Sequence, residues 1–359
     1  MGIKNVLILI LFSFRLHAQE SIATERGLKD YFSEHFSMGV AVSPRSLTTD
    51  EARIILKEFN SLTAENAMKM ERIHPNRDEY NWKAADSIAA FAVINKLKLR
   101  GHTLVWHRQA PDWFFLDEEG KEVSKKILLE RLKEHITEVV TRYKDVVYAW
   151  DVVNEAVSDD SDQYLRDSKW YRICGEEFIE KAFQWAHEAD PDALLYYNDY
   201  NETSAEKRAK IIKLIRGLQS KGIPIHGIGL QAHYSIGYPT HDALLNTLKD
   251  FGSLGLDLQI TELDISVYPG SDTKQATGTA NAITREQEWK QIEMYTRCFR
   301  LFKEFSHSIS SVTFWNISDR HSWLDNFPVR KRKNFPLLFD QKLNRKKVYF
   351  EVVKIAETD

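Results

Sequence analysis

The chain has 359 residues, with 49 Lys and Arg against 52 Asp and Glu, and a formal net charge of −3. A composition that is 43% hydrophobic and 28% charged is ordinary for a soluble globular protein. It argues against a disordered chain and against a protein dedicated to nucleic acid. The aromatic content of 12%, with 9 Trp and 14 Tyr, suits either a sugar-binding cleft or a large core, and composition does not separate the two.

The chain opens on a segment typical of a secretory signal peptide. Lys4 precedes an apolar run over residues 6–14, and Ala18 closes the segment. The run is too short to span a membrane as a mature helix. We therefore expect cleavage of residues 1–18, a mature domain of residues 19–359, and a secreted or periplasmic protein without a membrane span. An uncleaved membrane anchor is the alternative, because the cleavage region is imperfect.

Short apolar runs typical of buried strands recur along the rest of the chain. In chain order they begin at Met38, Ser61, Arg100, Val146, Leu194, Gly227, Leu258 and Ser311. Their length and their β-branched and aromatic residues favour strands over helices. The sequence therefore predicts eight strands.

Longer segments with helical periodicity separate these runs. Residues 126–143 place one apolar stripe on a helix, formed by Leu128, Leu132, Ile136, Val139, Val140 and Tyr143. An earlier helix begins with Thr48 and Glu51 at the spacing of a capping box. Residues 209–224 predict a helix that ends near Gly222, which suits a left-handed terminus.

Strands that alternate with helices predict an α/β fold, a (β/α)8 TIM barrel in a single domain. An open doubly wound sheet is the structural alternative. No Gly-rich dinucleotide fingerprint follows any of the predicted strands, which removes the usual signature of that fold. The polar segment 270–287 is interpreted as a long loop and not as a domain boundary.

Polar and aromatic residues gather at the carboxyl ends of the predicted strands. In a (β/α)8 barrel these ends meet on one face, where the active sites of such enzymes lie. The residues are Glu65, Asn66, Lys69, His102, Trp106, Asn154, Glu155, Asn198, Asp199, Gln231, His233, Glu262, Asp264 and Trp315. Each alone has an ordinary structural explanation, but together on one rim they predict a functional site.

Two glutamates of this rim suggest the breaking of a glycosidic bond. Glu155 follows the fourth predicted strand, and Glu262 lies in the seventh. Such a reaction needs one carboxylic acid to protonate the leaving oxygen and one carboxylate on the other side of the sugar ring. A separation of about 5 to 5.5 Å gives retention of configuration, and a wider one gives inversion. The sequence does not give this distance.

A zinc site formed by His102, His233 and Glu262 is a competing interpretation of the same rim. Zinc needs three convergent protein ligands, and the chain has no HExxH pairing that would supply two of them. We therefore expect no metal at the site.

Seven motifs in order carry a resemblance to a known family. They are FNSLTAENAMKME, GHTLVWHRQAPDW, WDVVNEAVSD, YYNDYN, GIGLQAHY, QITELDIS and ISDRHSW. From about Leu28 to Val353 the chain resembles glycoside hydrolase family 10, the β-1,4-xylanases. The resemblance implies a barrel that cuts xylan internally with retention and without a cofactor, and we expect a monomer. Broader activity on cellobiosides or other β-1,4-glucans, and a xylan-binding barrel without catalysis, are the alternatives.

The resemblance also implies roles for five residues. Glu155 is the acid/base and Glu262 the nucleophile. Asn154 hydrogen-bonds the 2-hydroxyl of the sugar next to the cut, His233 touches the nucleophile, and Asp264 holds the far nitrogen of the His233 ring. A donor between Glu262 and Asp264 explains why one face of an apolar strand carries two carboxylates.

The remaining residues implied by the resemblance bind sugar. Those expected to bind hydroxyls one or two sugars upstream of the cut are Glu65, Asn66 and Lys69. Those expected to wall the sugar at the cut are His102, Trp106, Gln231, Trp315 and Trp323. For Trp315 the alternative is a place in the core, facing the helices.

Three features leave alternatives open. Cys174 and Cys298 either pair in an oxidising compartment or remain buried thiols. Asn316 follows Trp315 where members of the resembled family commonly carry Gly, which puts the fine geometry of the indole in doubt. The basic run 330–333 is interpreted as a solvated face, with a contact to acidic substituents of glucuronoxylan as the alternative.

Overall fold

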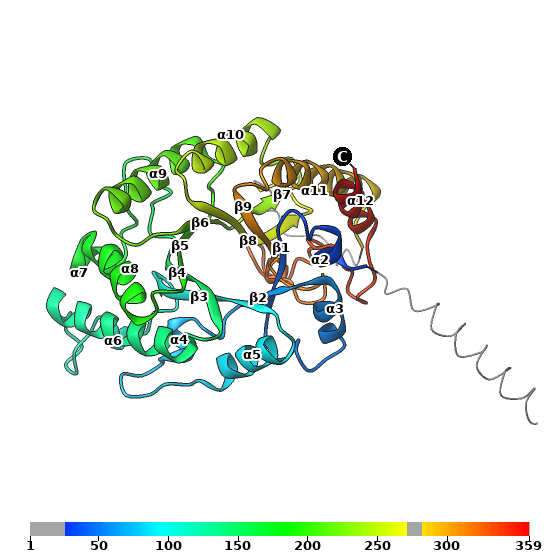
Figure 1. The fold of residues 1–359 in the computed structure, drawn as a ribbon. Helices are drawn as coiled ribbons and strands as arrows, with labels where there is room; N and C mark the ends of the chain where they lie inside the picture. Colours follow the sequence, from blue (N-terminus) through cyan, green and yellow to red (C-terminus); the bar gives the residue numbers. More distant parts are fainter. Residues whose placement is uncertain (1–25, 271–281, 359) are drawn as a thin grey trace, which may run out of the picture.

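A closed barrel of parallel strands forms the centre of the molecule (Figure 1). The computed structural model describes residues 26–270 and 282–358, so the predicted signal peptide lies outside the described residues. The barrel strands are β1 (Ser37–Val42), β2 (Ser61–Ala64), β3 (Lys98–Trp106), β4 (Val147–Asn154), β5 (Leu194–Asp199), β6 (Gly227–Leu230), β8 (Asp257–Ser266) and β9 (Ile309–Phe314). β6 pairs with β8 and β9 pairs with β1, which closes the ring. The predicted (β/α)8 barrel in a single domain is confirmed.

The sixth position of the barrel is split into two short strands. β6 ends at Leu230, and β7 (His233–Ser235) then pairs with the distal end of β8, where His233 lies opposite Asp264. Ala232, between the two strands, has a φ of 58°, in the left-handed region. The amide of Gln231 donates to the carbonyl of Asp199 at 3.0 Å, which ties the break to β5. The sequence predicts a single strand from Gly227, so this break was not predicted.

Helices surround the barrel (Figure 1). They are α2 (Leu28–Tyr31), α3 (Glu51–Glu58), α4 (Met70–Ile73), α5 (Lys83–Ile94), α6 (Lys125–Tyr143), α7 (Lys169–Cys174), α8 (Glu177–Ala189), α9 (Ala205–Ser220), α10 (His241–Gly252), α11 (Arg285–Glu304) and α12 (Lys347–Glu357). Two 3-10 turns, η1 (Asp112–Phe114) and η2 (Trp323–Asp325), lie in loops. No helix in the described ranges is long and apolar enough to cross a membrane.

The helix termini match the sequence predictions only in part. The predicted helix end at Gly222 is confirmed, because Gly222 follows α9 with a φ of 64°. The predicted capping box at Thr48 is wrong: α3 has Asp50 at its N-cap, and the Thr48 hydroxyl donates to the carbonyl of Arg45 at 3.1 Å. Most of the predicted loop 270–287 lies outside the described residues, and the prediction is wrong for its last three positions, because α11 begins at Arg285.

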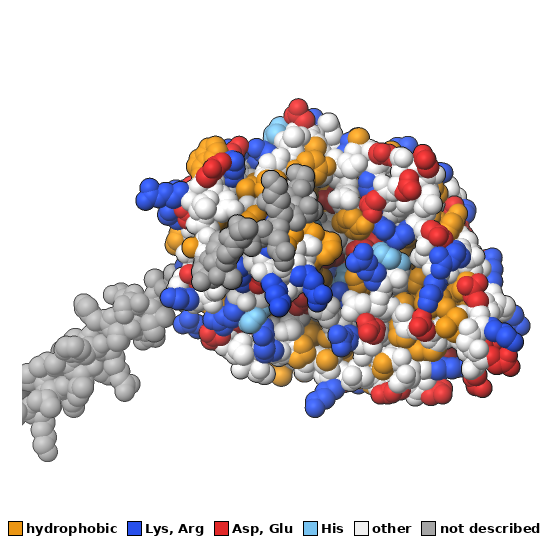
Figure 2. Space-filling view, turned by 180° about the vertical axis from the view of Figure 1, so that it is seen from behind, with side chains coloured by type: hydrophobic (Ala, Val, Ile, Leu, Met, Phe, Trp, Pro, Cys, Tyr) orange, Lys and Arg blue, Asp and Glu red, His pale blue; other side chains and the backbone are white. Residues whose placement is uncertain are grey.

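One face of the molecule carries side chains of both charges (Figure 2). Figure 2 shows Lys and Arg side chains interspersed with Asp and Glu side chains over the visible face. This distribution agrees with a formal net charge of only −3.

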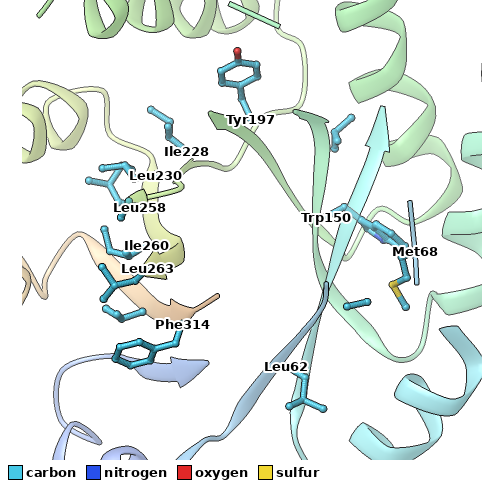
Figure 3. Packing of buried hydrophobic residues seen from close by; sticks show 14 of the residues in the cluster. Leu62, Met68, Trp150, Tyr197, Ile228, Leu230, Leu258, Ile260, Leu263 and Phe314 are labelled. Atoms are coloured by element: carbon cyan, nitrogen blue, oxygen red, sulfur yellow. The ribbon is translucent and has the colours of Figure 1, made fainter. Parts of the chain in front are cut away.

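A continuous hydrophobic layer fills the space between the barrel and the helices. Figure 3 shows part of it, including Leu62, Trp150, Ile228, Leu258, Ile260 and Phe314, all of them buried. The predicted apolar stripe of α6 is buried in the same cluster, so this prediction is confirmed. Gly101 on β3 pairs with Trp150 on β4, and a Cβ on Gly101 would lie 2.1 Å from Cε3 of the indole. Both cysteines, Cys174 and Cys298, are buried and free.

Candidate active site

A cavity of about 700 Å³ opens at the carboxyl ends of the barrel strands. Every residue for which the sequence predicted a catalytic or sugar-binding role lines it, whereas Asn198 and Asp199 of the predicted rim do not. These residues are Glu65, Asn66, Lys69, His102, Trp106, Asn154, Glu155, Gln231, His233, Glu262, Asp264, Trp315 and Trp323. The prediction that the strand ends form one rim therefore holds for these thirteen residues, and Glu155 and Glu262 lie at the same end of the fold.

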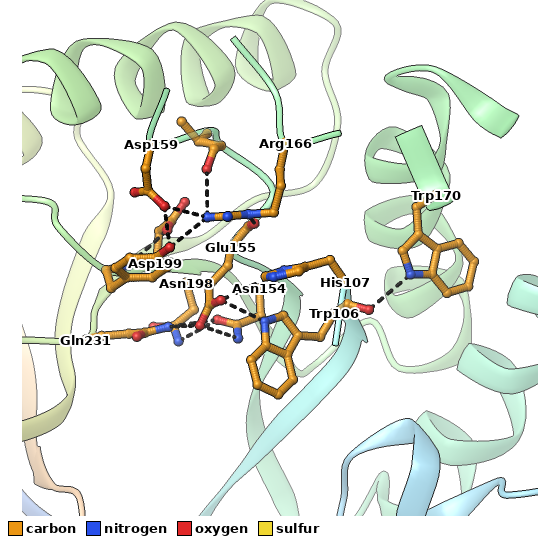
Figure 4. Close-up of polar contacts among 12 residues, drawn as sticks. Trp106, His107, Asn154, Glu155, Asp159, Arg166, Trp170, Asn198, Asp199 and Gln231 are labelled. Carbon is orange, nitrogen blue, oxygen red and sulfur yellow. Dashed lines mark hydrogen bonds and ion pairs between the residues drawn. The ribbon is translucent and has the colours of Figure 1, made fainter. Parts of the chain in front are cut away.

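Glu155 is the first residue after β4 and has a φ of 58°. Its carboxyl group accepts a hydrogen bond from Nε1 of Trp106 at 2.8 Å and one from Nε2 of Gln231 at 3.0 Å (Figure 4). Both donors are uncharged. They fix the direction of the carboxyl group without placing a full positive charge against it, which suits a group that has to gain and lose a proton.

His107 also lies beside this carboxyl group, with its Nδ1 3.8 Å from Oε2 of Glu155. Burial, together with the positive charges of Arg166 and Arg108, lowers the pKa of His107 to about 3. The ring is therefore neutral at ordinary pH. No role was predicted for His107 from the sequence. The pairing of β3 with β4 is irregular between His102 and Val105, which interrupts the simple alternation of side chains along β3.

Glu262, on β8, has a different environment. Its Oε1 accepts a hydrogen bond from Nδ2 of Asn198 at 2.8 Å, and its Oε2 lies 3.2 Å from Nε2 of His233. Burial alone would raise the pKa of Glu262, but the hydrogen bond from His233 and the nearby His102 lower it, and the net direction is downward. Glu262 is thus held as a carboxylate.

His233 is the positive partner that this carboxylate needs. Its Nδ1 lies 3.0 Å from Oδ1 of Asp264, while its Nε2 faces Glu262. Burial would lower the pKa of His233, but Asp264 and Glu262 outweigh it and raise the pKa to about 10. The other carboxylate oxygen of Asp264 accepts a hydrogen bond from Nε1 of Trp323 at 2.7 Å. The two carboxylates on one strand face are therefore separated by an imidazolium, as the sequence suggested.

A chain of amide contacts connects the two glutamates. Oδ1 of Asn154 accepts hydrogen bonds from Nδ2 of Asn198 at 3.0 Å and from Nε2 of Gln231 at 3.2 Å. The opposite orientation of the Asn154 amide would let its nitrogen donate to the carbonyl of Asn198 at 3.2 Å and its oxygen accept from Nε1 of Trp106 at 3.3 Å. It would also turn the nitrogen toward two other donors, Nδ2 of Asn198 and Nε2 of Gln231, so we assign the first orientation. Asn198 also donates to Glu262, and the hydroxyl of Thr261 donates to Oδ1 of Asn198 at 2.7 Å. Asn198 was part of the predicted rim, but no role was assigned to it.

A buried ion pair inside the barrel supports the cavity from below. Asp151 accepts hydrogen bonds from Arg100 and lies 2.9 Å from Nδ1 of His102. Burial would raise the pKa of Asp151, but Arg100 and His102 reverse the direction and lower it. His102 is thereby fixed at the base of the cavity. Sequence reasoning missed Asp151, although an Asp in the middle of an apolar strand is a signal that could have found it.

Aromatic rings form the walls of the cavity. The Trp315 ring lies 5.3 Å from the ring of His102 and 6.2 Å from that of His233. The Trp323 ring lies 4.9 Å from that of His233. Trp315 therefore faces the cavity, and the alternative that it packs against the helices is wrong.

Lys69 brings a buried cation to the opposite wall. Its Nζ donates to Oδ1 of Asn66 at 3.0 Å and lies 4.9 Å from the centre of the Trp106 ring. Burial lowers the pKa of Lys69, while Glu262 and Glu65 oppose this effect. Burial also raises the pKa of Glu65. This wall offers hydrogen-bonding groups next to an aromatic face, which suits the hydroxyls and the flat face of a sugar.

Asn316, the departure noted beside Trp315, adopts a backbone conformation that favours glycine, with a φ of 133°. Its Nδ2 donates to the carbonyl of His321 at 3.1 Å, and its Oδ1 accepts from the amide of Ile317 at 3.1 Å. The side chain is thus used within the loop after β9, while Trp315 still lines the cavity.

The basic run 330–333 is only partly a solvated face. Arg330 and Lys331 are exposed, as predicted. The prediction is wrong for Arg332, which is buried, lines the cavity and lies over the Tyr268 ring at 4.0 Å from its centre. Lys333 is half-buried and donates to the Asp325 carboxylate at 2.7 Å.

The competing zinc interpretation finds no support in the geometry. Both ring nitrogens of His233 face carboxylates, and its imidazolium form has no lone pair for a metal. Nδ1 of His102 faces Asp151. In residues 26–270 and 282–358, no group of three or more His, Cys, Asp or Glu residues could hold a metal ion.

Comparison with known proteins agrees with the geometry. Residues 27–355 match the family model described as glycosyl hydrolase family 10. The chain is 47% identical over 322 residues to endo-1,4-beta-xylanase B of Paenibacillus barcinonensis, and the matched region covers 90% of this chain and 96% of that protein. The chain is 45% identical over 350 residues to the beta-1,4-xylanase of Dictyoglomus thermophilum, and the matched region covers 97% of each of the two proteins. A crystal structure of xylanase XynB from Paenibacillus barcinonensis with a conduramine derivative matches with a TM-score of 0.89 at 46% identity, over 92% of this chain and 99% of that chain.

Proposed function

The chain belongs to glycosyl hydrolase family 10 and is a retaining endo-1,4-β-xylanase, and we propose that Glu262 is its nucleophile and Glu155 its acid/base. One observation carries this assignment of roles. Glu262 lies against an imidazolium, whereas the carboxyl group of Glu155 accepts hydrogen bonds from uncharged donors. A nucleophile has to be ionised, and an acid/base has to change its protonation during each turnover.

The proposed reaction has two steps. In the first, Glu262 attacks the anomeric carbon from one side of the sugar, and Glu155 gives its proton to the leaving oxygen on the other side. In the second, Glu155 takes a proton from water, which attacks the same carbon and releases Glu262. Two inversions give net retention. Asn154, beside both carboxyl groups, is proposed to bind the 2-hydroxyl, a contact that tightens in the transition state.

The proposed subsites follow from the cavity walls. Glu65, Asn66 and Lys69 would bind hydroxyls upstream of the cut. The residues proposed to wall the sugar at the cut are His102, Trp106, Gln231, Trp315 and Trp323. Xylose lacks the hydroxymethyl group of glucose, so indoles close to that ring carbon would exclude glucan by steric clash. Release of reducing sugar from xylan and from soluble β-glucan, compared at equal enzyme, measures this preference.

Three measurements test the assignment of the glutamates. Glu262→Ala should lose several orders of magnitude in turnover on every substrate, because the nucleophile is gone. Glu155→Ala should lose far more on xylo-oligosaccharides than on dinitrophenyl xylobioside, because only the former have a leaving group that needs a proton. Proton NMR should show the β-anomer as the first product. Normal turnover of Glu262→Ala, equal losses for Glu155→Ala on both substrates, or an α-product would contradict the proposal.

We also propose that the protein is secreted as a monomer. The support for secretion is the charged start and the apolar run of residues 6–14, which end before a small residue at Ala18. The interspersed charges of Figure 2 agree with a monomer. N-terminal sequencing of protein recovered from the medium should begin at Gln19, and light scattering should give the mass of one chain. An intact Met1 or the mass of a dimer would contradict these proposals.

A further inference from the structure

The backbone of the proposed acid/base is held from two sides. Glu155 is not a glycine, yet its φ is 58°, in the left-handed region that non-glycine residues rarely adopt. Its amide donates to the carbonyl of Asn198 at 2.9 Å. Its carbonyl accepts a hydrogen bond from Nε of Arg166 at 3.0 Å (Figure 4). The conformation that aims the carboxyl group into the cavity therefore depends on partners outside β4.

Arg166 lies at the end of the loop that begins at Glu155. The loop folds back on itself: Val157 pairs with Leu165 in an antiparallel bridge, and the amide of Arg166 donates to the carbonyl of Ala156 at 2.8 Å. Eleven positions after the glutamate in sequence, Arg166 thus returns to its backbone. No part of the sequence analysis assigned a role to this arginine.

The guanidinium of Arg166 reaches several acceptors at once. Besides the Glu155 carbonyl, Nη2 donates to the carbonyl of Val157 at 3.4 Å, to Oδ2 of Asp159 at 2.9 Å and to the hydroxyl of Tyr200 at 2.9 Å. A planar fork of five N–H groups can satisfy acceptors in several directions, whereas a lysine ammonium is a single point. The Arg166 side chain is 21% exposed, so these bonds are largely shielded from water.

The charges of this cluster are compensated locally. The Asp159 carboxylate pairs with Arg166 and also with Nζ of Lys207 at 3.0 Å. Burial would raise the pKa of Asp159, but Tyr200, Lys207 and Arg166 reverse this and lower it well below its usual range. Burial would lower the pKa of Arg166, but Tyr200 and Asp159 raise it above its usual value. Arg166 therefore bonds to the backbone of Glu155, and its charge is directed to Asp159 and not to the Glu155 carboxyl group.

We propose that Arg166 is a positioning residue for the acid/base, which holds the turn at Glu155 in the conformation from which its carboxyl group can reach the leaving oxygen. Its loss would displace the carboxyl group while leaving the nucleophile, which β8 and His233 hold, in place. The steps that depend on proton transfer by Glu155 would then slow, while attack by Glu262 would not. This inference rests on the proposed role of Glu155.

The experiment compares two substrates that differ in their need for a proton. Arg166→Gln removes the charge and the fork, and Arg166→Lys keeps the charge but not the fork. We expect kcat/KM of both variants to fall by about 10-fold to 100-fold on xylohexaose, the size of effect that a displacement near 1 Å produces. On dinitrophenyl xylobioside, kcat/KM should fall less than about 3-fold, because cleavage of this bond needs no proton.

A second readout uses an external nucleophile. Breakdown of the glycosyl-enzyme needs general base, so kcat of the variants on dinitrophenyl xylobioside should be low and should rise with added azide, which attacks without one. A β-xylobiosyl azide product should accompany the rise. Arg131→Lys is the matched control, since Arg131 donates to the loop carbonyls of Phe114 at 3.2 Å and Leu116 at 2.9 Å and none of its recorded bonds reaches either glutamate.

The outcomes separate this inference from the proposal on which it rests. Glu155→Ala is expected to lose more activity on xylohexaose than on dinitrophenyl xylobioside. If it does and neither Arg166 variant shows this difference, the inference about Arg166 is wrong and the role of Glu155 stands. If Glu155→Ala shows no such difference, the proposed acid/base role itself fails. An equal loss on both substrates, or the same difference in Arg131→Lys, would reduce Arg166 to a general structural role. If Arg166→Gln does not fold, the test uses Arg166→Lys alone, through the ratio of its loss of kcat/KM on xylohexaose to its loss on dinitrophenyl xylobioside.

Discussion

At the scale of single residues, the difference between the two glutamates depends on the atoms around each carboxyl group. Glu262 faces a ring nitrogen of His233, and Asp264 faces the other nitrogen of the same ring. His233 would titrate near pH 6.5 in an unfolded chain, whereas the folded protein raises its pKa to about 10. The imidazolium therefore stabilises the fold fully below pH 6.5, and this contribution is lost as the pH rises through about 10.

The first prediction concerns Asp264. Asp264→Asn removes one of the two carboxylates that keep His233 protonated, so the pKa of His233 should fall by at least about one unit toward neutral. Turnover above neutral pH should fall with it, because Glu262 then loses its charged partner. NMR titration of the His233 ring measures the pKa, and a pH–rate profile measures the activity. An unchanged His233 pKa would contradict the prediction.

The second prediction concerns the strained backbone at Asn316. Asn316→Ala and Asn316→Gly both lose the bonds to Ile317 and His321, but only alanine keeps a side chain at a φ of 133°. The alanine variant should therefore be less stable than the glycine variant by about 1 kcal/mol. Urea unfolding of the two proteins measures the difference. A glycine variant less stable than the alanine variant would mean that the backbone there is unstrained.

At the scale of secondary structure elements, two histidines join α4 to α6. His74, at the C-cap of α4, and His135, on α6, are both fully buried, and their Nδ1 atoms lie 3.2 Å apart. Nε2 of His74 lies 2.9 Å from the carbonyl of Arg77, so this nitrogen carries the hydrogen. Nδ1 of His74 then accepts from Nδ1 of His135. The contact needs one neutral ring that accepts, so protonation of His74 would break it.

The third prediction follows from this pair. Burial and then His74 lower the pKa of His135 to about 3, and burial lowers the pKa of His74. In the unfolded chain His135 binds a proton near pH 6.5, so stability should decrease as the pH falls from 6.5 toward 3, by at most about 1.4 kcal/mol per pH unit for this residue. The lowered pKa of His74 acts in the same direction. His135→Gln should show a smaller decrease. Urea unfolding at several pH values measures both slopes, and equal slopes would contradict the role of His135.

The helix termini show what local sequence can and cannot predict. Thr48 and Glu51 have the spacing of a capping box, yet Glu51 is 2% exposed and the chain enters α3 through Asp50. A genuine capping box lies at Thr284 and Gln287, in a segment that composition marked as loop. The motif alone cannot distinguish the two, because burial of one partner by the rest of the fold decides whether its side chain is free to cap.

At the scale of the whole molecule, the barrel and its catalytic rim could be predicted because both depend on short-range patterns. Apolar runs mark the strands, and polar residues at their ends mark the cavity. The residues that were missed, Asp151 and Arg166, and Asn198, whose role was not predicted, act through partners more than ten positions away in the chain. Their pairing depends on the register between strands and on the path of a loop, and a single sequence shows neither.

The fourth prediction concerns the charge of the whole molecule. A neutral xylo-oligosaccharide is not steered by the mixed surface charges, so its KM should change less than about twofold when NaCl rises from 0.05 to 0.5 M. Steady-state kinetics at the two salt concentrations measure this, with glucuronoxylan as the acidic comparison. A KM for the neutral substrate that rises more than about threefold would show an electrostatic contribution that the net charge of −3 does not suggest.

The interruption between β6 and β7 links the two chemical steps mechanically. Within three consecutive positions, Gln231 donates to the proposed acid/base and His233 contacts the proposed nucleophile. Any displacement of this tripeptide moves the supports of both glutamates at once. A substitution in this tripeptide therefore affects both bond cleavage and the hydrolysis that follows. We expect substitutions at Ala232 to slow the formation and the breakdown of the covalent intermediate together.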